Sequence, residues 1–166
     1  IERGGSLDAI YSDESQEWYT PPEIIELVRT VLGTIDLDPC SNEGKPRVAA
    51  KRHFTEKDDG LTKEWRGRVY MNPPYGSGIG NWVTKLVDGF KVGDITEAIA
   101  LVPARTDTEW WSSLRDATVC LIRGRLRFSD SENSAPFPSA VAYLGPDAPR
   151  FVATFKDKGD VWRRVR

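Results

Sequence analysis

The chain has 166 residues, of which 39% are hydrophobic and 29% are charged, and its formal net charge is −2. This length suits one domain with a full core, and no apolar run is long enough to cross a membrane. With one histidine and two widely spaced cysteines, Cys40 and Cys120, the composition argues against a zinc site or a Ser-His-Asp triad, and we expect no metal. Cysteines without a pairing pattern are typical of a reducing compartment, so we expect a cytoplasmic protein.

Positive charge is concentrated in two parts of the chain. Residues 1–44 hold 2 basic and 10 acidic side chains, residues 45–68 hold 8 and 4, and residues 101–166 hold 11 and 8. The densest basic stretch is Arg123-Gly124-Arg125-Leu126-Arg127. A basic strip on an acidic body is compatible with contacts to nucleic-acid phosphates. Arginines that protect a solvated strand edge would give the same pattern.

The first regular element that the sequence predicts is a helix. We expect Thr20 as its N-cap, Pro21 as its first helical residue and Glu23 as the partner that closes a capping box. Apolar residues at helical spacing continue to Gly33, which is typical of a helix end.

Two strands with a loop-rich stretch between them are expected next. Residues 34–38 alternate between apolar and polar side chains, as in a strand. Residues 40–67 favour loops, with one short helix expected at residues 48–52. The alternating run at residues 68–71 then ends directly in Asn72-Pro73-Pro74-Tyr75.

This four-residue turn is the most informative feature of the sequence. Proline lacks the N–H that a sheet ladder needs, so the strand must stop there. The Asn72 side-chain oxygen and the carbonyls beside the prolines then extend beyond the strand, where open α/β sheets bind ligands. Tyr75 offers a flat ring on which a base can stack. Two acceptors and a ring suit an exocyclic amino group on a planar heterocycle.

The second half of the chain predicts one packing helix followed mainly by strands. Trp82, Leu86 and Phe90 recur at helical spacing and indicate a packing face. The remaining elements, in order, are a strand at 97–102, a short helix at 107–114, and strands at 118–122, 125–128, 139–144 and 151–155. Alternating helices and strands followed by hairpin-like strands predict an α/β fold, with a mainly parallel sheet and antiparallel edge strands near the C-terminus.

Acidic residues also stand where predicted strands and turns end. Asp38 ends one strand and Asn72 follows another, so their loops share one crevice if the two strands are neighbours. Asp38 can order the following loop by accepting its N–H groups, or it can bind a cofactor. Asp59, in Asp58-Asp59-Gly60-Leu61, is a third candidate, although such turns are ordinary by themselves.

Together these segments resemble amino-group DNA methyltransferases that use S-adenosylmethionine, and in particular the small phage- and prophage-encoded DNA N6-adenine methyltransferases of the Dam type. The resemblance covers about residues 17–145 and rests on six segments in order: Trp18-Tyr19-Thr20-Pro21-Pro22, Asp36-Leu37-Asp38-Pro39-Cys40-Ser41, Asp59-Gly60-Leu61, Asn72-Pro73-Pro74-Tyr75, Leu101-Val102-Pro103-Ala104-Arg105-Thr106-Asp107-Thr108, and Arg123-Gly124-Arg125-Leu126-Arg127-Phe128. It implies a single-domain, Rossmann-like methyltransferase fold over residues 17–166. Residues 1–16 are polar and acidic without periodicity, so we expect a flexible arm there.

The resemblance also implies a role for individual residues. The catalytic motif would consist of Asn72, Pro73, Pro74 and Tyr75. Contacts to S-adenosylmethionine would come from Tyr19, Thr20, Pro21, Asp38, Pro39, Cys40, Asp59 and Leu61. Contacts to DNA are expected from Arg105, Arg123, Arg125, Arg127 and Phe137, although Arg105 can instead cap a helix and Phe137 can instead pack in the core.

One segment departs from the pattern of the wider superfamily. Its cofactor loop usually reads Asp-Pro-x-x-Gly-x-Gly, whereas this chain has Asn42 at the first glycine position and Gly44 at the second. Asparagine tolerates left-handed backbone, so we expect the turn to survive. For the acid that binds the cofactor ribose, the candidates are Glu43 and Glu56.

The implied reaction is direct methyl transfer to the N6 amine of an adenine that has flipped out of double-stranded DNA and stacks on Tyr75. Asn72 and the Pro73 carbonyl would hold the amine, so no histidine base is needed. The same turn can hold other planar amino groups, which leaves cytosine N4, RNA and protein glutamine as alternative substrates. A catalytically silent DNA-binding module is the alternative from another class. Protection against restriction and gene regulation both suit such an enzyme.

Overall fold

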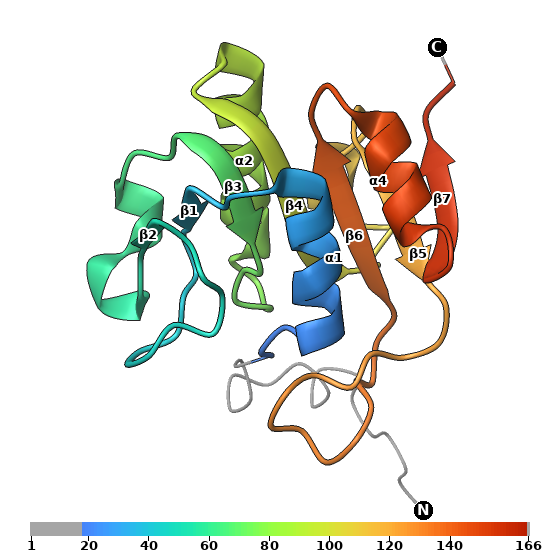
Figure 1. Ribbon diagram of the computed structural model, residues 1–166, viewed down its shortest axis with the longest axis horizontal. Helices are drawn as coiled ribbons and strands as arrows, with labels where there is room; N and C mark the ends of the chain where they lie inside the picture. Colours follow the sequence, from blue (N-terminus) through green and yellow to red (C-terminus); the bar gives the residue numbers. More distant parts are fainter. Residues whose placement is uncertain (1–17, 166) are drawn as a thin grey trace, which may run out of the picture.

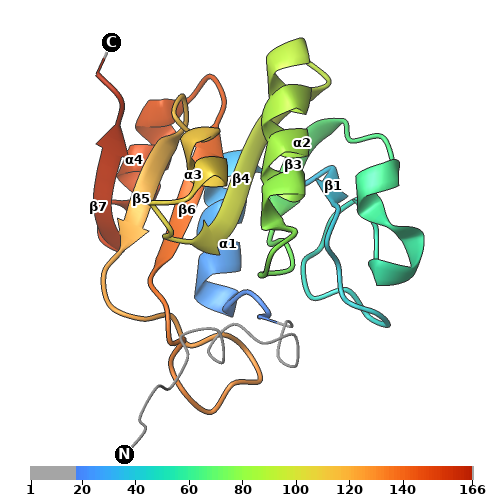
Figure 2. The ribbon, with the colours of Figure 1, turned by 180° about the vertical axis from the view of Figure 1, so that it is seen from behind.

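The computed structural model describes residues 18–165, and the arm predicted over residues 1–16 lies outside this range. The strands are β1 (Leu37–Asp38), β2 (Arg52–His53), β3 (Gly67–Met71), β4 (Ile95–Pro103), β5 (Thr118–Ile122), β6 (Ser139–Leu144) and β7 (Gly159–Arg163). The α-helices are α1 (Pro22–Leu32), α2 (Ile79–Val92), α3 (Glu109–Ser112) and α4 (Ala148–Phe155). Helices α1 and α4 cover one face of the sheet, and α2 and α3 cover the other (Figures 1 and 2).

The seven strands of the described chain form one mixed sheet in the order β2-β1-β3-β4-β6-β5-β7. The pairs β2–β1, β1–β3 and β3–β4 are parallel, whereas β4–β6, β6–β5 and β5–β7 are antiparallel. The expected mainly parallel sheet is therefore not confirmed, because half of the pairings are antiparallel and β6 lies inside the sheet. The connection from β4 through α3 leaves one strand position between β4 and β5. The chain then turns back after β5, and β6 occupies that position.

Helix α1 begins one residue later than the sequence predicts. Pro21 is the N-cap and Pro22 is the first helical residue. Thr20 does not cap the helix, because its hydroxyl lies 2.5 Å from the Tyr70 hydroxyl instead, and the predicted capping box does not form. Gly33 ends the helix as predicted, with a φ of 69° that favours glycine.

Other local predictions are wrong for identifiable reasons. Residues 48–52 form no helix, and residues 48–51 are instead an irregular, bent stretch that leads into β2. Residues 151–155 belong to α4, since two phenylalanines four positions apart also suit one face of a helix. Residues 125–128 lie in a loop, and the strand expected at residues 34–38 is reduced to β1. Strand β7, which has few apolar residues, was not predicted.

The hydrophobic core lies on both faces of the central strands. Every side chain of β6 is buried, as is the run Ala98–Pro103 of β4. Helices cover both faces there, which explains why these strands read as continuous apolar runs. Among the described residues, no helix is both long and apolar enough to cross a lipid bilayer.

One edge of the sheet gathers the segments that matter for function. Strands β1, β3 and β4 run in the same direction, so their carboxyl ends meet there. The loops over residues 39–51, 72–78 and 123–138 all extend from this edge (Figure 1). This is the edge of a partly parallel sheet where ligands bind.

Candidate active site

A pocket of about 400 Å³ opens at this edge. Its lining comes from five parts of the chain: Trp18 and Tyr19, residues 39–42, Thr55 with Glu56, Asp59 and Gly60, and Asn72–Pro74 with Trp82. The volume lies in the range of cofactor and small-molecule sites. The loops after β1 and β3 therefore share one crevice, as the sequence predicts.

Asn72 presents a free hydrogen-bond acceptor at the pocket wall. Its Nδ2 donates to the Trp18 carbonyl at 2.5 Å and to Thr20 Oγ1 at 3.3 Å. A carbonyl can only accept, so the amide nitrogen must face Trp18. Asn72 Oδ1 is buried and has no hydrogen-bond partner among the described residues. An acceptor buried in this way costs about 1–3 kcal/mol, which indicates a site that a ligand donor completes.

The rest of the predicted catalytic motif divides between the pocket and the core. Pro73 and Pro74 line the pocket. The Tyr75 ring does not: it is 8% exposed, and its hydroxyl donates to the Leu101 carbonyl at 3.3 Å. Burial raises the pKa of this hydroxyl well above its usual value, so it stays protonated. Stacking of a base on Tyr75 stays a prediction, because the buried ring is not accessible from the pocket in this structure.

Four aromatic rings form a cluster beneath the pocket. Tyr75 packs edge-on against Phe137, with ring centroids 5.4 Å apart, and against Phe128 at 6.2 Å. Trp18 contacts the same two phenylalanines at 5.3 and 5.4 Å. Phe137 is 5% exposed, so it packs in the core, which was the alternative to a contact with DNA. The cluster anchors the turn after β3 and the residues before α1 to the same loop.

Asp38 orders the loop that follows β1. The side chain is 4% exposed, and its Oδ1 accepts the Cys40 N–H at 3.1 Å, as predicted for a residue at this strand end. Burial raises the pKa of Asp38 to about 6, although the Cys40 N–H and the nearby His53 oppose the shift. Asp38 lies behind Pro39 and Cys40, which line the pocket. Burial and the Asp38 charge also raise the pKa of the Cys40 thiol, which disfavours a reactive thiolate.

The loop after Cys40 is held by a side chain and not by a left-handed asparagine. Asn42 Nδ2 donates to the carbonyls of Glu43 and Lys45 at 2.9 and 2.8 Å, and its Oδ1 accepts the Arg47 N–H at 3.0 Å. Gly44 is the residue with left-handed backbone, at a φ of 78°. Asn42 therefore does not adopt the left-handed backbone that was expected of it.

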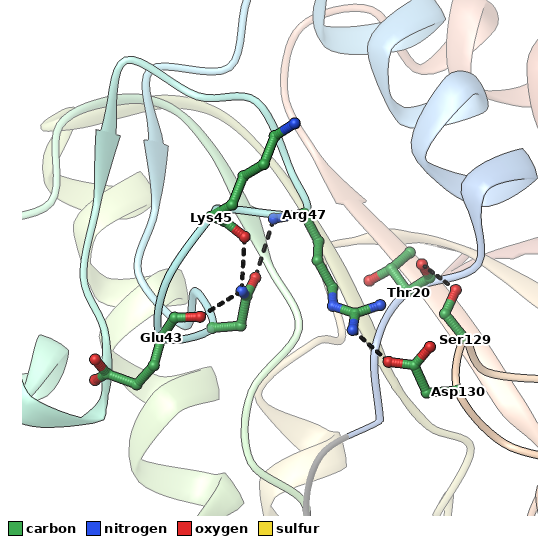
Figure 3. Close-up of polar contacts among 7 residues, drawn as sticks. Thr20, Glu43, Lys45, Arg47, Ser129 and Asp130 are labelled. Carbon is green, nitrogen blue, oxygen red and sulfur yellow. Dashed lines mark hydrogen bonds and ion pairs between the residues drawn. The ribbon is translucent and has the colours of Figure 1, made fainter.

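Arg47 connects this loop to two other segments. Its guanidinium lies 3.8 Å from the centroid of the Tyr19 ring and forms an ion pair with Asp130. Ser129 donates its N–H to the Tyr19 carbonyl at 3.0 Å and its hydroxyl to the Thr20 carbonyl at 3.4 Å. Figure 3 shows Arg47 reaching across to Asp130, with Ser129 beside Thr20. The loop after β1, the residues before α1 and the loop after β5 are thus joined.

The predicted cofactor residues divide into three groups. Tyr19, Pro39, Cys40 and Asp59 line the pocket. Thr20, Pro21 and Asp38 are buried behind that lining. Leu61 lines a separate hollow beside α2.

Acidic side chains lie at one wall of the pocket. Glu56 and Asp59 line it, whereas Glu43 does not and forms an ion pair on the surface. Of the two candidates for a ribose ligand, the structure therefore favours Glu56. A Cβ on Gly60 would lie 2.5 Å from the Pro39 carbonyl oxygen, so this turn packs directly on the loop after β1.

Six lining residues were not predicted as site residues: Trp18, Ser41, Asn42, Thr55, Gly60 and Trp82. Trp82 was predicted only as a packing residue, and its ring does stack on Trp65 at 5.9 Å. Ser41 Oγ is also buried, and the Ser41 side chain lies beside the Asp38 carboxylate. Trp18 and Ser41 could have been predicted as site residues, because both lie in segments that carry the resemblance to the methyltransferases.

None of the predicted DNA-binding arginines lines the pocket. Arg123 pairs with Asp160 at 3.4 Å, and Arg127 Nη2 donates to the Glu132 carbonyl at 2.6 Å. Arg125 is exposed and Arg105 is partly buried. The first three belong to the loop over residues 123–138, which extends from the pocket edge (Figure 1).

Comparison with known proteins identifies one family. The family model described as DNA N-6-adenine-methyltransferase (Dam) matches residues 9–143, which include every residue that lines the pocket. No curated protein matches the chain. Within residues 18–165, no group of three or more His, Cys, Asp or Glu side chains is arranged to hold a metal ion.

Proposed function

Because the chain belongs to the DNA N-6-adenine-methyltransferase (Dam) family, we propose that it transfers a methyl group from S-adenosylmethionine to the N6 amine of adenine in double-stranded DNA. The observation that carries this proposal is the buried Asn72 Oδ1, an acceptor without a partner among the described residues, at the wall of a pocket of about 400 Å³. In Rossmann-like folds, ligands bind beyond the carboxyl ends of the parallel strands. The location of this pocket supports a Rossmann-like fold for residues 17–166.

The residues of the pocket fit S-adenosylmethionine. Tyr19, Pro39, Cys40 and Asp59 would contact it, while Asp38 would keep the loop in place through the Cys40 N–H. Glu56 is a suitable acceptor for ribose hydroxyls. When bound, this cofactor supplies an electrophilic methyl group on a positively charged sulfur.

Asn72 would act on the weak nucleophile of adenine. The N6 lone pair is delocalised into the ring, so the free amine attacks poorly. Hydrogen bonds from its two hydrogens to Asn72 Oδ1 and the Pro73 carbonyl would favour a pyramidal nitrogen with an exposed lone pair. N6 would form its bond to the methyl carbon as the bond from that carbon to sulfur breaks, so that S-adenosylhomocysteine leaves, and N6 would then lose a proton to water. Acceptors of this kind act by positioning and by stabilising charge.

The target base must leave the duplex to reach this pocket. We infer that it flips out and stacks on Tyr75, which requires the turn after β3 to shift because the ring is now buried. Arg105, Arg123, Arg125 and Arg127 would contact phosphates beside the opened base pair.

Transfer of a labelled methyl group from S-adenosylmethionine to a panel of unmethylated DNA, RNA and unrelated proteins tests this function. We expect label in DNA alone. Label in RNA or protein would overturn the proposed substrate. If calorimetry detected no binding of S-adenosylmethionine, a catalytically silent DNA-binding module would be the better interpretation.

A further inference from the structure

The residues just before α1 determine which atom of the Asn72 amide faces the pocket. The Trp18 carbonyl accepts from Asn72 Nδ2 at 2.5 Å. If the amide were rotated by half a turn, two oxygens would face each other at that distance, which is strongly unfavourable. The contact therefore leaves Oδ1 as the atom available to a substrate amine.

Thr20 supplies a second hold on the same amide. Its Oγ1 lies 3.3 Å from Asn72 Nδ2 and 2.5 Å from the Tyr70 hydroxyl. Thr20 is 6% exposed and does not line the pocket, so its position does not support the cofactor contact expected from the sequence. Burial raises the pKa of Tyr70, so the phenol stays neutral and keeps its proton for this network.

Other contacts keep the segment Trp18–Thr20 in place. The Trp18 ring packs against Phe128 and Phe137, and the Tyr19 carbonyl accepts the Ser129 N–H at 3.0 Å. The loop over residues 123–138 holds the segment on one side and Tyr70 of β3 holds it on the other. Thr20 therefore presents a fixed oxygen to the Asn72 amide.

We propose that Thr20 is a positioning residue for methyl transfer, which together with the Trp18 carbonyl orients Asn72 Oδ1 toward the substrate amine. This inference rests on the proposed function of Asn72. Thr20 touches neither cofactor nor base in this role, so its loss lowers the rate of transfer without weakening the binding of S-adenosylmethionine.

The test compares Thr20→Val, which has nearly the same shape, with Thr20→Ser, which keeps the hydroxyl. We expect Thr20→Val to lower the single-turnover rate of methyl transfer about tenfold, as for one lost hydrogen bond in the transition state. The dissociation constant of S-adenosylmethionine, measured by calorimetry, should stay within about twofold. Thr20→Ser should restore most of the rate. Thr30→Val, which removes a hydroxyl from the exposed face of α1, is the matched control and should behave as the wild type.

A double variant separates positioning from stability. Thr20→Val leaves the buried Tyr70 hydroxyl without its partner and lowers stability, whereas Thr20→Val combined with Tyr70→Phe removes both groups. We expect the thermal midpoint of the double variant to recover while its transfer rate stays about tenfold low. Tyr70→Phe alone should keep most of the rate, since Thr20 can still hold Asn72.

Four results would overturn the inference. A rate that recovers with stability in the double variant would make the role of Thr20 merely structural. Weaker cofactor binding with an unchanged rate in Thr20→Val would place Thr20 against the cofactor. A wild-type rate and affinity in Thr20→Val would remove Thr20 from the mechanism and leave the proposed function intact. No transfer by the wild type to any substrate would overturn the proposed function as well.

Discussion

The side chain of Asn72 and the main-chain carbonyl of Trp18, 54 positions apart in the sequence, are joined by a hydrogen bond of 2.5 Å. Asn72 follows β3, whereas Trp18 precedes α1, so the contact forms only when the helix has docked on the sheet. It ties the orientation of one amide to the packing of the whole domain. The candidate catalytic acceptor is thus set by tertiary structure and not by its turn alone.

Replacing the amide by a carboxylate should expose this dependence. In Asn72→Asp, a charged oxygen would face the Trp18 carbonyl, so we expect a loss of about 2 kcal/mol in unfolding free energy at pH 7 and no methyl transfer. The loss should shrink at pH 4, where the new carboxyl is protonated. Urea denaturation measures this, with the exposed Asn81→Asp as control. An active Asn72→Asp of wild-type stability would contradict the proposed geometry.

Asp38 should make stability fall as pH rises. Burial raises the folded pKa of Asp38 from its ordinary value of 3.8 to about 6. The folded state therefore holds this proton more tightly, so its stabilising effect is complete below about pH 4 and is lost as pH rises through 6. The total change is at most about 3 kcal/mol. Asp38→Asn keeps an acceptor for the Cys40 N–H but does not titrate. The unfolding free energy of the wild type relative to this variant should therefore decline as pH rises from about 4 through 6.

Asp36 provides a control of opposite sign. A hydrogen bond from the Arg68 N–H lowers the pKa of Asp36, and the nearby Lys51 adds to the effect. The contribution of Asp36 is therefore present above its ordinary pKa of 3.8 and is lost as pH falls. Urea titrations at several pH values should show opposite trends for Asp38→Asn and Asp36→Asn. Parallel trends would contradict the burial of Asp38.

Gly60 should tolerate no side chain. A Cβ at this position would lie 2.5 Å from the Pro39 carbonyl oxygen, and backbone cannot yield as a flexible side chain does. We expect Gly60→Ala to cost about 1–3 kcal/mol in unfolding free energy and to weaken binding of S-adenosylmethionine. Gly78→Ala, where the Cβ would meet nothing within 4 Å, should change stability by less than about 0.5 kcal/mol. Equal effects of the two changes would show that the Gly60 turn does not shape the pocket.

Arg47 should act on the cofactor through Tyr19. Arg47→Ala removes the cation–π contact and the ion pair with Asp130, so we expect binding of S-adenosylmethionine to weaken about threefold. Arg47→Lys keeps the charge but loses the planar stack on Tyr19, so its affinity for S-adenosylmethionine should lie between those of the wild type and Arg47→Ala. Calorimetry measures this effect, with the exposed Arg66→Ala as control. An unchanged affinity in Arg47→Ala would show that the position of the Tyr19 ring does not depend on Arg47.

The features of the site that the sequence predicts are those set by local chemistry. Proline must end β3 at Asn72, and an acid after an alternating run at Asp38 must meet the next backbone N–H. Gly33 ends a helix for the same kind of reason. These constraints act within a few residues, so no knowledge of the tertiary fold is needed to read them.

The features that the sequence does not predict depend on segments that meet only in the folded chain. The sequence predicts Thr20 as an N-cap, yet its hydroxyl forms hydrogen bonds with Tyr70 and Asn72 and not with the first turn of the helix. Asn42 reads as a substitute for glycine, but its amide finds three backbone partners. Likewise, nothing local indicates that β6 enters the middle of the sheet, because strand order follows from long-range pairing.

The most direct test of the role of Asn72 is mass spectrometry of nucleosides from DNA incubated with S-adenosylmethionine and either the wild type or Asn72→Ala. We predict N6-methyladenine with the wild type and at least a hundredfold less with Asn72→Ala, because removing one transition-state donor or acceptor in such a site costs about 10²–10³ in rate. Binding of S-adenosylmethionine to both proteins should differ by less than about twofold. N6-methyladenine formed equally well by Asn72→Ala, or no N6-methyladenine with the wild type, would contradict the proposed mechanism.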